Sequence, residues 1–244
     1  MALQTVMMGF SGVLMNDEAI HADIINQLLI AENLRPIPLT PSEQYRLRYL
    51  GLGDLIRLRT LWLEQGRVLT PSSFYGLLKR KQEAYQKRVT ELPRLPLIPY
   101  LVEALETMER LGLSLALVTG LAGEQVRYFL ERTQLSSRFR VVITGEDIPL
   151  DQLENPGYLH QQALQQLQLS PEQALAIEAT YRGIAASQAA GIPVVGLTTF
   201  FPFHMLQRRA NWVIDSFLQM EWERILYWAA TGADRPHRDP ARIP

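Results

Sequence analysis

Short, almost continuous apolar runs alternate with segments of helical periodicity through the second half of the chain. Each run ends at a glycine or a polar turn, and the runs predict strands over residues 113–120, 141–145, 174–178, 192–197 and 212–217. Apolar spacing of three and four predicts helices over residues 101–111, 124–133, 158–167, 183–190 and 221–228. Apolar strands that alternate with helices are typical of a parallel sheet covered on both faces, so we expect a doubly wound α/β fold.

The first half of the chain follows a different pattern. An apolar run over residues 3–8 that ends at Gly9 predicts one more strand of the same sheet. A mostly helical segment follows, and the proline-rich sequence PRLPLIP ends it. We therefore expect a Rossmann-like core domain of residues 1–16 plus 93–231, an inserted helical domain of residues 17–92, and a flexible tail of residues 232–244.

Composition limits the classes of protein to be considered. Of the 244 residues, 47% are hydrophobic and 20% charged, and the formal net charge of −1 offers no field that attracts nucleic acid. The chain has no cysteine, which excludes disulfides and thiolate chemistry. Neither a signal peptide nor an apolar run of the roughly 20 residues that cross a bilayer is present. We expect a cytoplasmic protein with no membrane span and no nucleic-acid partner.

Ligands of doubly wound sheets bind at the carboxyl ends of the strands. Three sequences at those ends resemble the first, second and fourth motifs of the haloacid dehalogenase superfamily, in its β-phosphoglucomutase- and phosphatase-like subgroup: MGFSGVLMNDEAIHADIINQLL, LALVTG and ALAIEATYRGIAASQAAGIPVVGL. The resemblance covers about residues 3–228 and implies that residues 17–92 form a helical cap. The stretch FPFHMLQR is similar to one in cyanobacterial members of this family.

The resemblance implies phosphoryl transfer by two carboxylates of the first motif, a nucleophile and a general acid. Gly9 and Ser11 stand at these two positions, and neither a missing side chain nor a serine hydroxyl can do that work. The fourth motif is implied to supply acidic ligands for Mg²⁺. Glu178 is retained as a remnant there, while Ala179 stands at the other ligand position. We therefore expect no metal site and no cofactor.

Two further motifs are implied to bind the phosphate. Thr119 and Gly120 keep the hydroxyl and the amide of the second motif as a phosphate-binding remnant, although a threonine can also end a strand by turn chemistry. The lysine of the third motif would stand at Gln152 or Leu153, and no lysine follows Lys87. The phosphate charge therefore has no amine to neutralise it.

Several polar residues near these motifs have more ordinary interpretations. Asp17 and Glu18 are expected to cap the following helix, and His21 to make surface or interdomain hydrogen bonds. Arg182 is interpreted as a solvated arginine, with a reach into the ligand site as the alternative. Glu178 would then be a hydrogen-bonded remnant or the partner of Arg182.

Two loops allow more than one interpretation. Gly51-Leu52-Gly53 is expected to be a turn between two cap helices. The aromatic sequence FFPFHML at residues 200–206 would be a protein-binding patch if exposed, or would pack beneath the terminal helix with Trp212, Trp222 and Trp228.

The sequence thus favours a pseudoenzyme of this family, with a non-catalytic scaffold or regulatory role. It would bind an unknown protein partner or a small phosphorylated ligand. The alternative is a weak or divergent phosphatase, or another hydrolase, that acts on a small phosphoester with displaced groups such as Glu178 or Asp17.

Overall fold

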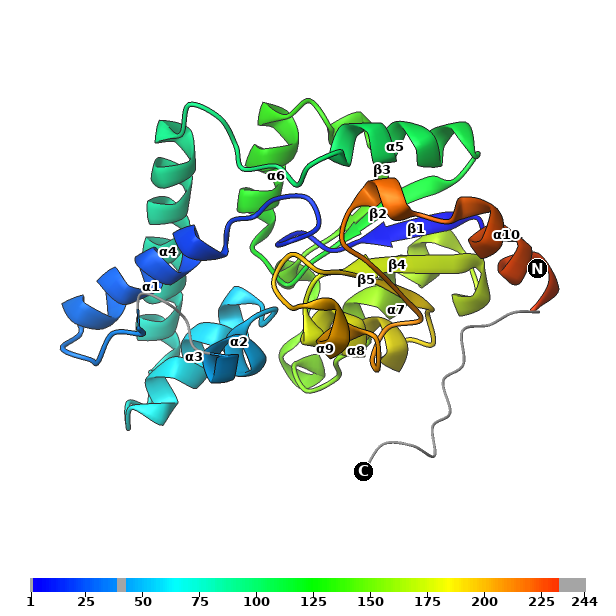
Figure 1. The fold of residues 1–244 in the computed structure, drawn as a ribbon. Coiled ribbons are helices and arrows are strands. Elements are labelled where there is room, and N and C mark those ends of the chain that lie inside the picture. The colour runs from blue at the N-terminus through cyan, green and yellow to red at the C-terminus, as the bar shows by residue number, and fades with distance from the viewer. Residues whose placement is uncertain (1, 39–42, 233–244) are drawn as a thin grey trace.

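The computed structural model describes residues 2–38 and 43–232 (Figure 1). At its centre lies a six-stranded sheet in the order β3-β2-β1-β4-β5-β6, and every neighbouring pair is parallel. The strands are β1 (Thr5–Met8), β2 (Ser114–Val118), β3 (Phe139–Ile143), β4 (Ala174–Glu178), β5 (Val194–Leu197) and β6 (Trp212–Ile214). The direction of strand addition reverses between β1 and β4, which is where doubly wound sheets bind ligands. The predicted doubly wound α/β fold is confirmed.

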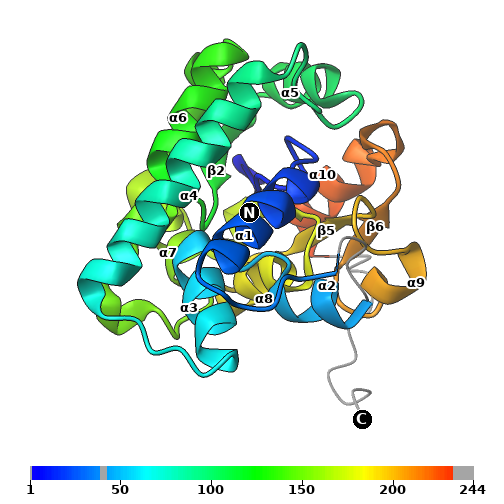
Figure 2. The same cartoon turned by 90° about the vertical axis from the view of Figure 1, so that its left-hand side faces the viewer.

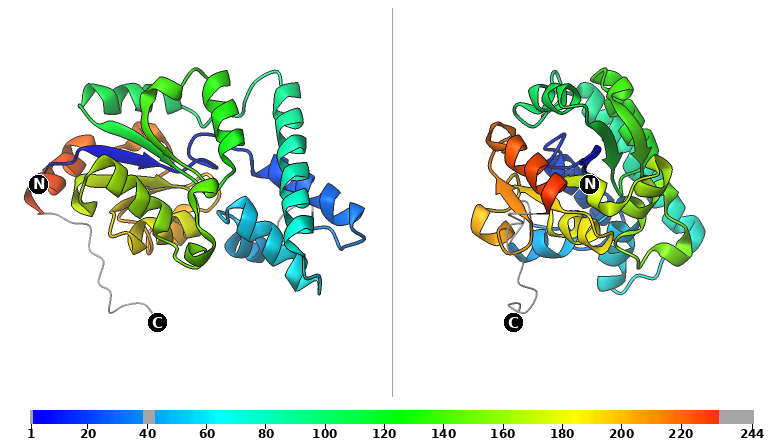
Figure 3. Two further views of the ribbon diagram at one scale, coloured as in Figure 1. Left: turned by 180° about the vertical axis from the view of Figure 1, so that it is seen from behind. Right: turned by 90° about the vertical axis from the view of Figure 1, so that its right-hand side faces the viewer.

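Helices cover both faces of the sheet (Figures 1 and 3). One face packs against α5 (Leu101–Arg110), α6 (Gly123–Arg132) and α10 (Trp222–Thr231). The other face packs against α7 (Tyr158–Leu167), α8 (Tyr181–Ala189) and the short α9 (Phe203–Leu206). Successive side chains of a strand point to opposite faces of the sheet, so Val6 and Met8 of β1 lie in the core on the first face and Met7 lies in the core on the second.

Four helices lie together beyond the carboxyl ends of the strands (Figure 2). They are α1 (Glu18–Ala31), α2 (Glu43–Tyr49), α3 (Asp54–Glu64) and α4 (Pro71–Glu91). The chain enters and leaves this group side by side, because the amide of Ile98 donates to the carbonyl oxygen of Leu14 at 3.0 Å. We call helices α1–α4 the cap. In the described part of the chain, no helix combines the length and the apolar character that crossing a bilayer requires.

The C-terminal region differs from the sequence expectation at its last strand. The strand predicted over residues 212–217 ends at Ile214, because the hydroxyl of Ser216 accepts from the amide of Leu218 and begins a 3-10 turn. Similar short turns lie at Ser136–Arg138, Gly145–Asp147, Leu150–Gln152 and Pro171–Gln173. From residue 233 onward, the expected tail lies outside the described residues.

The aromatic loop after β5 does not pack beneath α10. Phe201 stacks on Tyr181 of α8 with ring centroids 4.4 Å apart, and Phe200 lies over Gly12. Phe203 is 48% exposed. The tryptophans expected to cover this loop make their own contacts, and the rings of Trp212 and Trp228 lie 5.2 Å apart.

Candidate functional site

A cleft of about 540 Å³ lies between the cap and the carboxyl ends of the strands. Five residues singled out in the sequence line it together: Gly9, Ser11, Thr119, Gly120 and Glu178. They meet there because β1, β2 and β4 are neighbours in the sheet and all end at this edge. Ala179 does not line the cleft, since it is fully buried with its Cβ beside Gly12.

The side chain of Glu178 fills the space next to Gly9. A Cβ atom built on Gly9 would lie 2.5 Å from Glu178 Oε2, and one built on Gly183 would overlap the same carboxylate. Glu178 is 7% exposed, so this carboxylate is largely withdrawn from water. The position that the resemblance assigns to a nucleophile is therefore occupied by a neighbouring side chain.

The partner of Glu178 is His160 and not Arg182. His160, on α7, is 4% exposed, and its Nε2 atom lies 3.4 Å from Glu178 Oε1 and 3.1 Å from Ser187 Oγ. The hydroxyl of Ser187 donates to the carbonyl oxygen of Gly183 at 2.9 Å, which leaves its oxygen to accept from the imidazole. Sequence reasoning missed His160, because no local pattern joins this residue of α7 to Glu178 at the end of β4.

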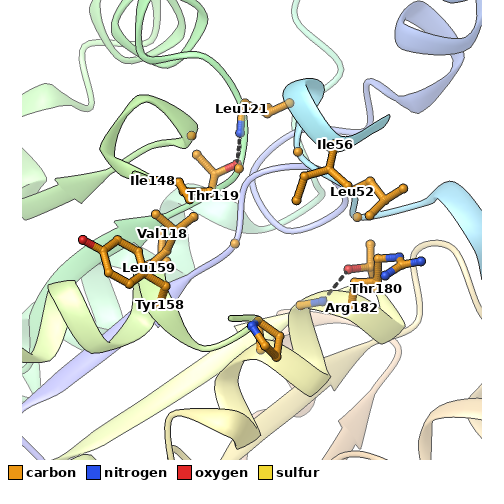
Figure 4. Close-up of a pocket in the computed structure, with 18 of the residues that line it drawn as sticks. Leu52, Ile56, Val118, Thr119, Leu121, Ile148, Tyr158, Leu159, Thr180 and Arg182 are labelled. Carbon is orange, nitrogen blue, oxygen red and sulfur yellow. Dashed lines mark hydrogen bonds between the residues drawn. The ribbon is translucent and has the colours of Figure 1, made fainter. Parts of the chain in front are cut away.

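The remnants of the other motifs are engaged in local structure. The hydroxyl of Thr119 accepts from the amide of Leu121 at 3.2 Å, as a turn residue does (Figure 4). Gln152 and Leu153, at which the resemblance would place a lysine, both line the cleft. Arg182 donates to the carbonyl oxygen of Arg48 in the cap at 2.9 Å, and partial burial of its guanidinium lowers the pKa of Arg182.

These groups do not fit the magnesium ion that the family resemblance implies. Mg²⁺ requires oxygen ligands in octahedral geometry, usually from one or two carboxylates and a phosphate. Gly9 and Ala179 offer no side-chain oxygen, and one oxygen of Glu178 faces an imidazole. Among the described residues, no three His, Asp or Glu side chains are grouped as metal ligands.

The sequence suggested that residues 51–53 form only a turn between two cap helices. In the structure this segment also contacts the core. Leu52 is buried and lines the cleft. A Cβ atom on Gly53 would lie 2.5 Å from the carbonyl oxygen of Gly120, and one on Gly51 would overlap Thr180. The amide of Asp54 also donates to that Gly120 oxygen at 3.3 Å. Glycine is needed here because the cap backbone rests directly on the backbone of the core.

Gly53→Ala is expected to lower the free energy of unfolding by about 2 kcal/mol, because the added methyl group forces two backbones apart. The backbone of Gly53 has φ −58° and ψ 155°, which alanine can adopt, so the loss does not come from backbone strain. Gly76→Ala is the control, since nothing lies within 4 Å of a Cβ there, and it should stabilise α4 by up to about 1 kcal/mol. Thermal unfolding measures the stability of both variants. Equal stability of Gly53→Ala and Gly76→Ala would contradict the prediction.

A buried polar cluster lies behind the cleft, where the sequence suggested helix caps. Asp17 stands at the N-cap position of α1, but its side chain makes no capping bond. Its Oδ2 atom lies 3.0 Å from His21 Nε2 and accepts from the hydroxyl of Tyr85 at 2.8 Å. Burial alone would raise the pKa of Asp17, but the charge and hydrogen bond of His21, with bonds from Tyr85 and Ser11, outweigh it and hold that pKa below its usual value.

Two buried ion pairs extend this cluster through the cap. Glu18, also expected to cap α1, pairs with Arg57 of α3 at 3.1 Å. Asp54 of α3 pairs with Lys81 of α4 at 2.5 Å. Each pair joins two different cap helices, so these charges fix how the helices sit against one another. We call Asp17, Glu18, His21, Asp54, Arg57, Lys81 and Tyr85 the cap network.

Comparisons with known proteins agree with this architecture. Residues 6–197 match the family model described as haloacid dehalogenase-like hydrolase. A phosphoglycolate phosphatase of Haemophilus influenzae (strain 86-028NP) is 28% identical over 228 residues, which cover 90% of this chain and 98% of that protein.

Solved structures show the same fold at low sequence identity. A β-phosphoglucomutase of Clostridium difficile is similar with a TM-score of 0.79 and 15% identity, over 93% of this chain and 97% of the other. CbbY of Rhodobacter sphaeroides, solved in complex with phosphate, has a TM-score of 0.74 and 20% identity, over 90% and 96% of the two chains. Since the family model spans most of the sheet and the whole cap, this chain belongs to the haloacid dehalogenase-like hydrolase family.

Proposed function

We propose that this chain is a non-catalytic member of its family, which has kept the cleft as a binding site and has lost phosphoryl transfer. One observation carries the proposal. The buried carboxylate of Glu178, held by His160, takes up the space beside Gly9 in which a nucleophilic side chain would have to stand.

The chemistry supports the same conclusion. An aspartyl-phosphate intermediate needs a carboxylate that can approach phosphorus, and the leaving alcohol needs a proton donor. Glu178 points across the sheet edge to His160, and the hydroxyl of Ser11 helps to lower the pKa of Asp17. Loss of a nucleophile alone typically costs about a millionfold in turnover. We also propose that no Mg²⁺ is bound, because the oxygen ligands do not fit it.

The experiment is an assay of the whole chain with Mg²⁺ and three substrates: p-nitrophenyl phosphate, phosphoglycolate and a hexose phosphate. The last two follow from the names of the relatives. We expect turnover at the level of buffer for the unaltered chain and for Glu178→Gln alike. A contaminating phosphatase would give equal rates in both preparations. Turnover that disappears in Glu178→Gln, or a phosphorylated side chain trapped on this protein, would establish the divergent phosphatase instead.

The biological role in this proposal is binding, to a protein partner or to a small ligand in the cleft, with the cytoplasm as the proposed location. The cap and the core meet through backbone contacts at Gly53 and Gly120, which are retained although the reactive groups are absent. The volume of about 540 Å³ between them is available to such a ligand.

A further inference from the structure

The cleft beneath the cap is large and mostly apolar. Its volume of about 540 Å³ lies within the roughly 300–1,000 Å³ of sites that hold small molecules. Aliphatic side chains from both the cap and the core contribute to this lining. Figure 4 shows Leu52 and Ile56 of the cap on one side of the cavity and Val118, Ile148 and Leu159 of the core on the other. This lining favours the removal of an apolar ligand from water.

The arginines of the cleft lining are held by groups of the protein itself. Arg57 is 4% exposed, pairs with Glu18, and donates to the carbonyl oxygen of Tyr49 at 3.1 Å. Arg182 is exposed, donates to the cap backbone, and points away from Thr119 in Figure 4.

A phosphate group bound beside Thr119 would therefore lose its hydration water and gain few favourable charge contacts in return. The described part of the lining contains no lysine, and the floor carries the carboxylate of Glu178. Burial of a doubly charged group next to a carboxylate is strongly unfavourable without a matching cation. The charges of the cleft thus select against phosphate esters.

Two histidines of the cleft lining also face carboxylates of the protein. His21 and His160 are 1% and 4% exposed. His21 Nε2 lies 3.0 Å from Asp17 Oδ2, and His160 Nε2 lies 3.4 Å from Glu178 Oε1. The two imidazoles are therefore paired within the protein, as the arginines are.

We propose that the cleft binds an uncharged, largely aliphatic small molecule. This proposal rests on the proposed function, because a working phosphatase would have to admit a phosphate at the same place. It names the ligand class that the cleft takes once the phosphate chemistry is absent.

The first test measures binding of PRODAN, an uncharged naphthalene with one carbonyl group whose emission shifts to the blue in apolar surroundings. We expect saturable binding to the unaltered chain. Ile56→Glu places a charge in the lining, and Leu159→Glu does the same from the core side, so each should weaken binding by about tenfold or more. Leu63→Glu is the matched control on α3, where the side chain is 57% exposed, and it should change binding by less than about twofold.

The second test needs no variant and reads the charge preference directly. Hexanol, hexanoate and hexyl phosphate share one aliphatic tail and differ in the charge of the head group. We expect hexanol to displace PRODAN at concentrations about tenfold lower than either anion, because the anions lose hydration without gaining a partner. Displacement by hexyl phosphate or inorganic phosphate at lower concentration than hexanol would overturn the proposal.

The two proposals fail in different ways. Absence of PRODAN binding to the folded chain, or equal binding to Ile56→Glu, Leu159→Glu and Leu63→Glu, removes the apolar ligand and leaves the non-catalytic function standing. Circular dichroism of the variants shows whether they are folded. Turnover of phosphoglycolate by the same preparation would contradict the proposed function, whether or not PRODAN binds.

Discussion

Replacing Lys81 with methionine is expected to lower the free energy of unfolding by about 3–5 kcal/mol, because it leaves a buried carboxylate without its partner. Lys81 and Asp54 are 1% and 4% exposed, and their Nζ and Oδ1 atoms lie 2.5 Å apart. Methionine keeps the unbranched apolar stem, so the loss reports the charge and not a cavity. Urea unfolding at neutral pH measures the difference.

The pH dependence of this loss identifies its cause. Burial raises the pKa of Asp54, but the charges of Lys81 and His21 outweigh it, so the pKa lies below the ordinary 3.8. The stability from ionised Asp54 is therefore complete above pH 3.8 and is lost as the pH falls through the lowered folded value. Without Lys81, burial favours the protonated form of this carboxylate, so the stability deficit of Lys81→Met should begin to shrink above pH 3.8 as the pH falls, and continue to shrink below it.

Lys79→Met is the control for this prediction. Lys79 lies on the same helix with its side chain 77% exposed, and its ion pair with Glu83 spans 3.9 Å, so its loss should cost less than about 0.5 kcal/mol. Equal effects of the two substitutions would show that the Asp54–Lys81 pair does not hold the cap.

The cap network accounts for the fixed placement of the cap over the cleft. Asp17 and Glu18 stand where the chain leaves the core, and their partners lie on α4 and α3. Asp54 follows Gly53, the residue that rests on Gly120. Loss of one pair therefore disturbs both the packing of the cap helices and the loop that closes the cleft.

Most of the fold was predictable because strands and helices leave different periodicities. The predicted bounds of β4 and α7, residues 174–178 and 158–167, are those of the structure. The pattern does not specify strand order, since a buried parallel strand is apolar on both faces wherever it lies. The pattern also predicted a strand that is longer than β6, because Phe217 is buried like a strand residue although it belongs to a 3-10 turn.

The sequence predicted where the site lies, but it did not predict which side chains contact one another there. Gly9, Thr119 and Glu178 could be placed at one edge because each follows a parallel strand. The contact of His160 with Glu178 joins a helix to a strand, and no local pattern encodes it.

The cap network did leave a signal in the sequence. Leu77, Lys81, Tyr85 and Val89 recur every four residues on the buried face of α4, so Lys81 stands at an apolar position of that helix. A lysine on such a face requires a buried anion.

Gly9→Asp is expected to lower the free energy of unfolding by about 2 kcal/mol in metal-free buffer, because the new carboxylate enters a space that Glu178 fills. A Cβ atom there would already lie 2.5 Å from Glu178 Oε2, and the two buried like charges would repel. Metal-free buffer is required, since two carboxylates can attract a divalent cation. Urea unfolding at neutral pH is again the measurement.

The double variant Gly9→Asp with Glu178→Gln decides whether the two positions compete. If Glu178 occupies the place of the nucleophile, removal of its charge should restore about 1–2 kcal/mol beyond the sum of the single effects. Gly76→Asp serves as the control for introducing aspartate, because an added Cβ there has nothing within 4 Å. Strictly additive effects would mean that Glu178 and residue 9 do not share one space, and the non-catalytic assignment would then lose the contact on which it depends.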